Sequence, residues 1–86
     1  MPLISRFFGI SIYMYFGGHA PPHFHAKYNE EEALIEIEHL QLLAGNLPPR
    51  ALGLVIEWAM LNKQELTKNW ENVEQSLPLN KISPLT

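Results

Sequence analysis

The sequence contains no cysteine and no aspartate, and it has few basic residues. The absence of cysteine excludes disulfide bonds and thiolate zinc sites, and the absence of aspartate excludes a Ser-His-Asp catalytic triad. The six Lys and Arg residues are outnumbered by nine glutamates, which gives a net charge of −3 without any basic run. Because domains that grip a nucleic-acid backbone usually present a basic face, nucleic acid is a disfavoured partner.

Long hydrophobic runs are also missing. No apolar segment approaches the roughly 20 residues that a membrane-spanning helix needs, and residues 7–16 alternate like a strand. We therefore expect a cytoplasmic protein that does not contact a membrane. The length of 86 residues predicts a single domain over residues 1–86. Such a chain has one small core, because it buries only about 60–65% of its unfolded surface.

Three segments alternate apolar and polar residues with the period of two that is typical of half-buried strands. They cover residues 10–16, 23–28 and 33–38, and residues 39–46 form a connector after the last of them. Gly17-Gly18 ends the first segment, and two prolines stiffen the connection to the second.

The second and third segments are expected to form a hairpin. A two-residue loop at positions 29–30 sets Ala26 opposite Ala33 and Phe24 opposite Ile35. A four-residue loop also pairs apolar with apolar residues, whereas a loop of odd length misaligns the two faces. Both allowed registers leave the other face of the sheet polar and aromatic. The side chains expected there are Tyr13, Tyr15, His23, His25, Lys27, Leu34, Glu36 and Glu38.

From Arg50 onward the apolar spacing becomes helical. One side of the wheel carries Leu52, Val55, Ile56, Ala59, Leu66, Trp70 and Val73. Asn62 followed by Glu65 resembles a capping box, which predicts a kink or a break near Asn62. The fold class is therefore α+β: a three-stranded antiparallel sheet followed by one long kinked helix or two helices, packed on one face of the sheet.

Leu54, Trp58 and Leu61 form a second apolar stripe on the opposite flank of the helical segment. In one interpretation this stripe belongs to the core and is covered by a terminal segment. In the other it is an exposed patch that binds a partner protein or a second copy of the chain, with Trp58 as the main contact, since Trp is common among binding hot spots.

Several short motifs together resemble a known bacterial family. They are Met1 to Ile10, Tyr13-Met14-Tyr15, His19-Ala-Pro-Pro-His23-Phe-His25-Ala26, Leu47 to Ala51, Glu57-Trp58, Asn69-Trp70 and the tail from Pro78 to Leu85. The chain is similar to the domain of unknown function 4160 family over nearly its whole length. The resemblance implies a small bacterial protein whose gene neighbours that of another small protein, as in a toxin–antitoxin pair. It implies no catalytic residues.

Three of the four histidines, His19, His23 and His25, lie within seven positions of one another. His23 and His25 stand roughly 6.5–7 Å apart along one strand face, and Glu36 could supply a fourth ligand. A divalent metal bound by His19, His23 and His25 is one hypothesis, although not the favoured one. The cofactor requirement is left open.

The same histidines could act in catalysis. Imidazoles titrate near neutrality, so His23 and His25 could serve as general base and general acid in a metal-independent endoribonuclease-type toxin. Lys27 would stabilise the phosphate, and Tyr13 and Tyr15 would stack on unpaired bases. The neighbouring glutamates oppose this, because they repel phosphate.

The remaining interpretation is a sheet face in which Glu36 is a cross-strand charge partner of the histidines. The leading functional hypothesis is a component of a toxin–antitoxin-like two-gene module that acts by binding a protein through this His-rich face. The expected partner is a small protein encoded nearby, a second copy of the chain, or both. The binding residues are predicted to be Tyr13, Tyr15, His19, Glu36 and Trp58. Whether the protein is an enzyme is left open.

Overall fold

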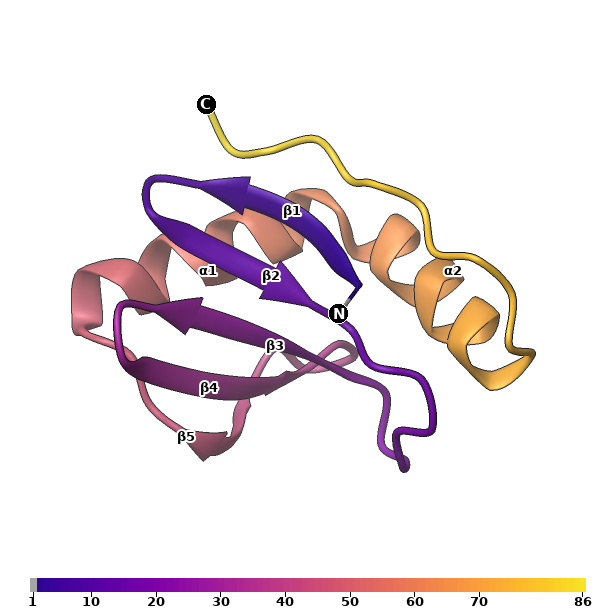
Figure 1. Cartoon of the computed structure of the whole chain (residues 1–86). Helices are drawn as coiled ribbons and strands as arrows, with labels where there is room; N and C mark the ends of the chain where they lie inside the picture. The colour runs from indigo at the N-terminus through magenta and orange to yellow at the C-terminus, as the bar shows by residue number, and fades with distance from the viewer. Residues whose placement is uncertain (1) are drawn as a thin grey trace.

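The computed structural model describes residues 2–86 and shows a sheet with helices on one side (Figure 1). The antiparallel sheet has five strands, whose spatial order β1-β2-β3-β4-β5 follows the chain. The strands are β1 Leu3–Phe7, β2 Ile10–Tyr13, β3 His23–Tyr28, β4 Glu31–Glu36 and β5 Leu42–Gly45, and the helices are α1 Pro49–Leu61 and α2 Lys63–Glu74. The predicted α+β class, with an antiparallel sheet and two helices, is confirmed.

The prediction of three strands is wrong, because β1 and β5 also belong to the sheet. In β1 the neighbouring residues Ile4 and Ser5 are both buried, and the pairing with β2 shifts between Leu3 and Ser5. The shift breaks the period of two by which a strand is recognised. All four residues of β5 are exposed, so this edge strand has no buried face that an alternating pattern could reveal.

The β3–β4 hairpin has the register predicted for a two-residue loop. Ala26 lies opposite Ala33 and Phe24 opposite Ile35, with residues 29–30 in the turn. The turn uses Asn29 at a φ of 54°, a left-handed conformation that Asn adopts more readily than most residues. Two predicted bounds change: β2 ends at Tyr13, and β4 covers Glu31–Glu36 instead of residues 33–38.

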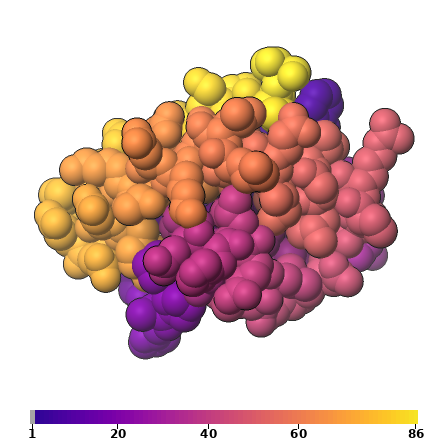
Figure 2. Space-filling model, turned by 180° about the vertical axis from the view of Figure 1, so that it is seen from behind, coloured from indigo at the N-terminus to yellow at the C-terminus, as the bar shows by residue number. Residues whose placement is uncertain are grey.

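The helices and the C-terminal tail form the back of the molecule (Figure 2). In Figure 1, α1 lies behind the sheet and α2 continues beyond its end, beside the loop that joins β2 to β3. The segment between β4 and β5 meets the junction of the two helices, where Lys63 Nζ donates to the carbonyl of Glu38. In the part of the chain that the structure describes, the opposite face of the sheet carries no helix. Within residues 2–86, neither helix has the length and apolar character that crossing a bilayer would require.

Trp58 lies in the core, which corrects the interpretation of its stripe as an exposed patch. Its side chain is fully buried, with its ring 5.4 Å from that of Phe7 and 5.9 Å from that of Phe24. Its Nε1 donates a 2.8 Å hydrogen bond to the carbonyl of Ser83 in the tail, which satisfies the one polar atom of the ring. Of the same stripe only Leu61 is exposed, at 70%.

The helical segment breaks at Asn62, as predicted, but not through a capping box. The Asn62 side chain makes no hydrogen bond at the start of α2. Its Nδ2 donates instead to the carbonyl of Trp58, at 2.8 Å, near the end of α1. Asn62 therefore satisfies one of the carbonyls that the end of α1 leaves without an intrahelical partner.

The C-terminal tail runs along α2 and the outer edge of β1 (Figure 1). Asn69 exchanges two 2.9 Å hydrogen bonds with the backbone of Asn80, and the Ile82 amide donates to the Ile4 carbonyl at 2.8 Å. The tail thereby covers a strand edge that would otherwise offer unpaired backbone groups to other chains.

Candidate functional site

Five ring side chains lie in succession from the open face of the sheet to α2; we call them the aromatic row. The Tyr13 and Tyr15 rings stack with centroids 6.1 Å apart, and the Tyr15 ring meets the His25 ring edge-on at 4.5 Å. The His25 ring lies 5.4 Å from the His23 ring, which lies 5.1 Å from the Trp70 ring. Separations of this size are those of interacting aromatic pairs.

Strand pairing positions the centre of the row. In the antiparallel register Tyr13 stands directly opposite His25, so their side chains emerge side by side. His23 is two residues before His25 and therefore shares its face. Its Nδ1 donates to the Pro21 carbonyl at 2.8 Å, which orients the ring, and Trp70 closes the row from α2.

His25 is the most constrained titratable group of the row. Its Nδ1 lies 3.2 Å from Glu32 Oε2, and its side chain is only 18% exposed. Burial lowers the pKa of His25 below its usual value, although the nearby Glu32 carboxylate opposes this shift. Burial, with Glu32 and Tyr13 as smaller causes, raises the pKa of Tyr15. Both shifts favour the neutral forms of the His25 and Tyr15 side chains, with the Glu32 carboxylate beside His25.

Glu36 stands opposite His23 in the register, on the predicted face. Its carboxylate, however, engages other partners: Oε1 accepts from His39 Nδ1 at 2.8 Å and from Gln41 Nε2 at 3.1 Å. Glu36 thus ties β4 to the turn after it. The predicted charge pairing between Glu36 and the histidines is replaced by the contact of His25 with Glu32.

The other predicted site residues are less closely connected to the row. Lys27 shares the open face, where it stands opposite Ser11 on one side and Glu32 on the other. His19 is exposed in the loop between β2 and β3. Glu38 was expected on the open face, but it lies beyond the end of β4 and lines a groove on the helix side with Lys63. This correction arises because the strand ends two residues earlier than its alternation suggested.

The structure does not bring His19, His23 and His25 together as metal ligands. Within residues 2–86, no three His or Glu side chains converge closely enough to hold an ion. The residues present therefore do not fit the metal hypothesis.

Two members of the site were not predicted. Trp70 was assigned to the buried side of the helix, where it does lie, but its contact with His23 joins residues far apart in the sequence. Glu32 lay outside the predicted strand, which began at residue 33. The sequence did contain a signal for the position of Glu32. A two-residue loop at positions 29–30 makes Glu32 part of the strand, on the same face as Leu34 and Glu36.

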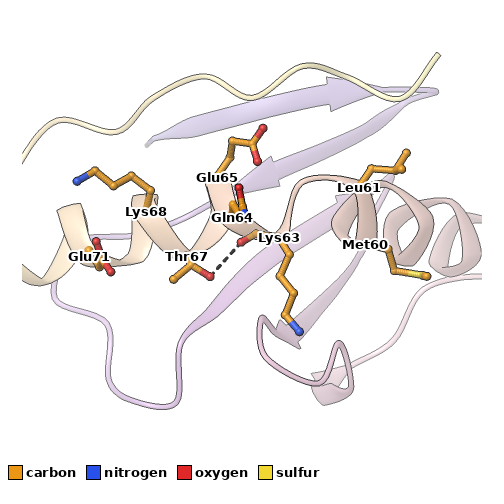
Figure 3. A pocket seen from close by; sticks show the side chains of 8 residues that line it. All are labelled: Met60, Leu61, Lys63, Gln64, Glu65, Thr67, Lys68 and Glu71. Atoms are coloured by element: carbon orange, nitrogen blue, oxygen red, sulfur yellow. Dashed lines mark hydrogen bonds between the residues drawn. The ribbon is translucent and has the colours of Figure 1, made fainter.

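A second surface feature is the groove at the junction of α1 and α2 (Figure 3). It is lined by Met60, Leu61, Lys63, Gln64, Glu65, Thr67, Lys68 and Glu71. The side chains drawn in Figure 3 spread outward from the two helices instead of converging, and Thr67 Oγ1 is engaged with the Lys63 carbonyl at 2.9 Å. This groove therefore lacks a set of polar groups directed at one ligand.

Comparison with known proteins identifies a family. The model of the domain of unknown function DUF4160 matches residues 9–71, a range that contains all five residues of the aromatic row. The chain belongs to the DUF4160 family. No curated protein and no solved structure matches the chain significantly. The family carries no assigned activity, so the functional argument depends on the site itself.

Proposed function

We propose that this DUF4160 protein is one component of a toxin–antitoxin-like two-gene module and binds a partner protein through the aromatic row. The row carries the proposal, because Tyr13, Tyr15, His25 and His23 are half-buried rings on the open side of the sheet, with Trp70 of α2 packed against one end of the row. Aromatic rings are enriched where proteins bind one another, since they offer much apolar area at little cost in side-chain entropy. The two-gene arrangement is what the family resemblance implies.

The charges around the row favour a protein over an RNA partner. Glu32 lies beside His25, and burial disfavours the imidazolium form that would attract phosphate. The whole chain carries a net charge of −3. A complementary surface would present apolar groups flanked by Lys or Arg, because such groups suit both the rings and Glu32.

Co-expression with the product of the neighbouring gene tests this proposal. We expect the two proteins to co-purify, and we expect Tyr13→Ala and His23→Ala each to weaken binding tenfold or more in calorimetric titrations. A tenfold loss corresponds to about 1.4 kcal/mol, an ordinary value for an interface aromatic. Leu61→Ser, on the exposed helix surface, is the matched control and should bind normally.

Two outcomes count against the proposal. If Leu61→Ser weakens binding while the row variants do not, the partner docks on the helices. If the product of the neighbouring gene does not co-purify with this chain, the proposal of a two-gene module is wrong. Sedimentation of the purified chain then tests the other expected partner, a second copy of itself.

A ribonuclease-type toxin is the second candidate, favoured by one observation. The His23 and His25 rings lie 5.4 Å apart, close enough to act on one phosphodiester as acid and base. Their Nδ1 atoms are engaged by the Pro21 carbonyl and Glu32, so proton transfer would fall to Nε2. Lys27 would face the phosphate. Cleavage of RNA, or growth arrest by this chain alone, should disappear in a His23→Ala/His25→Ala double variant; persistence in that variant rules the candidate out.

A further inference from the structure

The turn between β1 and β2 contains a residue that its backbone conformation disfavours. Phe7 pairs with Ile10, so Phe8 and Gly9 form a two-residue hairpin loop. Their φ angles are 50° and 78°. Hairpin turns with two positive φ angles favour Asn, Asp and Gly, because a side chain with a bulky Cβ substituent crowds the left-handed conformation.

The second hairpin provides an internal comparison. Its first loop residue is Asn29, at a φ of 54°, in the position that Phe8 occupies in the first hairpin. A Phe at this position costs about 1 kcal/mol or more relative to an Asn. The residue is 59% exposed, and its ring packs edge-on against that of Phe7 with centroids 6.4 Å apart. A largely exposed aromatic residue in a strained backbone conformation indicates a function.

Phe8 forms one wall of a pocket at the end of the sheet away from the histidines. The pocket lies between the β1–β2 turn, the end of β3 at Tyr28 and the start of α1, where Pro48 and Leu54 line it. Its volume is about 350 Å³. Small-molecule sites span about 300–1,000 Å³, so this pocket suits a ligand of about one ring with a short substituent.

Arg50 gives the pocket its charge. It is the one charged residue in the lining, and within residues 2–86 it forms no ion pair. The first turn of α1 contains no acidic residue, so no carboxylate within that turn neutralises Arg50. A planar guanidinium binds a carboxylate through two parallel hydrogen bonds, and the rest of the lining is mainly apolar.

We propose that the pocket formed by Phe8, Tyr28, Arg50 and Leu54 binds a small molecule with an apolar body and a carboxylate. The body lies between Phe8 and Leu54, and the carboxylate meets Arg50 at the rim. The proposal goes beyond partner binding at the aromatic row, because the two sites lie at opposite ends of β3 and share no residue.

The test is an amide-resonance titration of the ¹⁵N-labelled protein with phenylacetate, with phenylacetamide as the uncharged control of equal size. Phenylacetate should shift the amides of Gly9, Ala51 and Leu54 saturably, and phenylacetamide should bind at least fivefold more weakly. Arg50→Gln should remove the preference for the acid. Arg6→Gln, which alters an exposed arginine on β1 outside the pocket, should leave the affinity unchanged.

Phe8→Asn separates function from folding. Since Asn suits the turn, the variant should be as stable as the parent or more stable in urea, yet it should lose fivefold or more in phenylacetate affinity. Three results overturn the proposal: equal affinity for the amide, which would mean that the pocket accepts any apolar group; unchanged acid preference in Arg50→Gln; or a Phe8→Asn variant that binds normally.

Discussion

Replacing Asn69 with alanine is expected to lower the free energy of unfolding by about 2–3 kcal/mol. Asn69 is fully buried, and its side-chain amide donates to the Asn80 carbonyl while its Oδ1 accepts from the Asn80 amide, both at 2.9 Å. Each hydrogen bond contributes about 0.5–1.5 kcal/mol net, so the pair contributes about 2 kcal/mol. The backbone groups of Asn80, left without partners in a partly buried place, add the remainder.

This loss is large for a chain of 86 residues. Domains of this length are stabilised by about 4–13 kcal/mol, and 1 kcal/mol corresponds to roughly 4–8 °C in melting temperature. The Asn69→Ala protein should therefore melt roughly 10–20 °C below the parent. Detachment of the tail would also uncover the edge of β1 that Ile82 now pairs through its bond to Ile4.

Urea unfolding followed by tryptophan fluorescence measures the change, because Trp58 and Trp70 are both buried. Asn72→Ala is the matched control, since the Asn72 side chain makes a single, longer bond of 3.2 Å to the Pro78 carbonyl. We expect it to cost about 1 kcal/mol. The reasoning is refuted if Asn69→Ala costs no more than Asn72→Ala at an unchanged denaturant slope.

Two further predictions concern His25 and Gly45. Because burial lowers the pKa of His25, the unfolded chain binds more protons than the folded one below about pH 6.5, so the free energy of unfolding should fall as the pH decreases through this range. The slope should be at most about 1.4 kcal/mol per pH unit. Urea unfolding of the parent and of His25→Gln from pH 5 to 8 isolates this slope, and a difference between them that does not change with pH contradicts the prediction. Gly45 has a φ of 70°, and an added Cβ would lie 2.1 Å from the Glu32 carbonyl oxygen, so Gly45→Ala should cost about 2–4 kcal/mol. Gly53 lies within α1 with open space around it, so Gly53→Ala should raise the free energy of unfolding by up to about 1 kcal/mol. Equal effects of the two alanine substitutions in urea unfolding would show that the close approach at Gly45 is unimportant.

The central hairpin could be predicted from the sequence because the middle of one of its faces is fully buried. Phe24, Ala26, Ala33 and Ile35 are all inaccessible to solvent. A slip of one residue would expose all of them, so the pattern alone selects the register. The same reasoning fails for β1, where a register shift interrupts the alternation, and for β5, which is held in the sheet by backbone pairing and has no buried side chain.

Helical periodicity identified the helical segment, and the pairing of Asn62 with Glu65 indicated its break, but neither showed whether the stripe that contains Trp58 is covered. Trp58 lies on a stripe that could face a core or a partner, and the covering element is a tail that contributes a backbone carbonyl from Ser83. Irregular segments carry no period, so their contacts cannot be read from spacing. The cap at Asn62 was assigned to the wrong helix for a different reason. The Asn side chain can form a hydrogen bond forward or backward along the chain, and the sequence does not show which.

Strand parity predicted the part of the candidate site that lies on β2, β3 and β4. Parity placed His23 and His25 on one face, with Tyr13 and Glu36 nearby. It could not supply Trp70, because the orientation of α2 relative to the sheet depends on packing between distant segments. It also could not decide which carboxylate His25 contacts, since Glu32 and Glu36 share its face and only the side-chain geometry distinguishes them.

The anchoring of the tail and the geometry of the row are connected through α2. Asn69 and Trp70 are consecutive residues, so their side chains point about 100° apart around the helix axis. Asn69 binds Asn80, while the Trp70 ring packs against His23. A rotation of α2 that loosened one contact would displace the other. The tail therefore helps to fix the rotation of α2 and, with it, the position of Trp70 at the end of the row. If the aromatic row binds a partner as proposed, Asn69→Ala should weaken that binding in calorimetric titrations, although Asn69 lies outside the row.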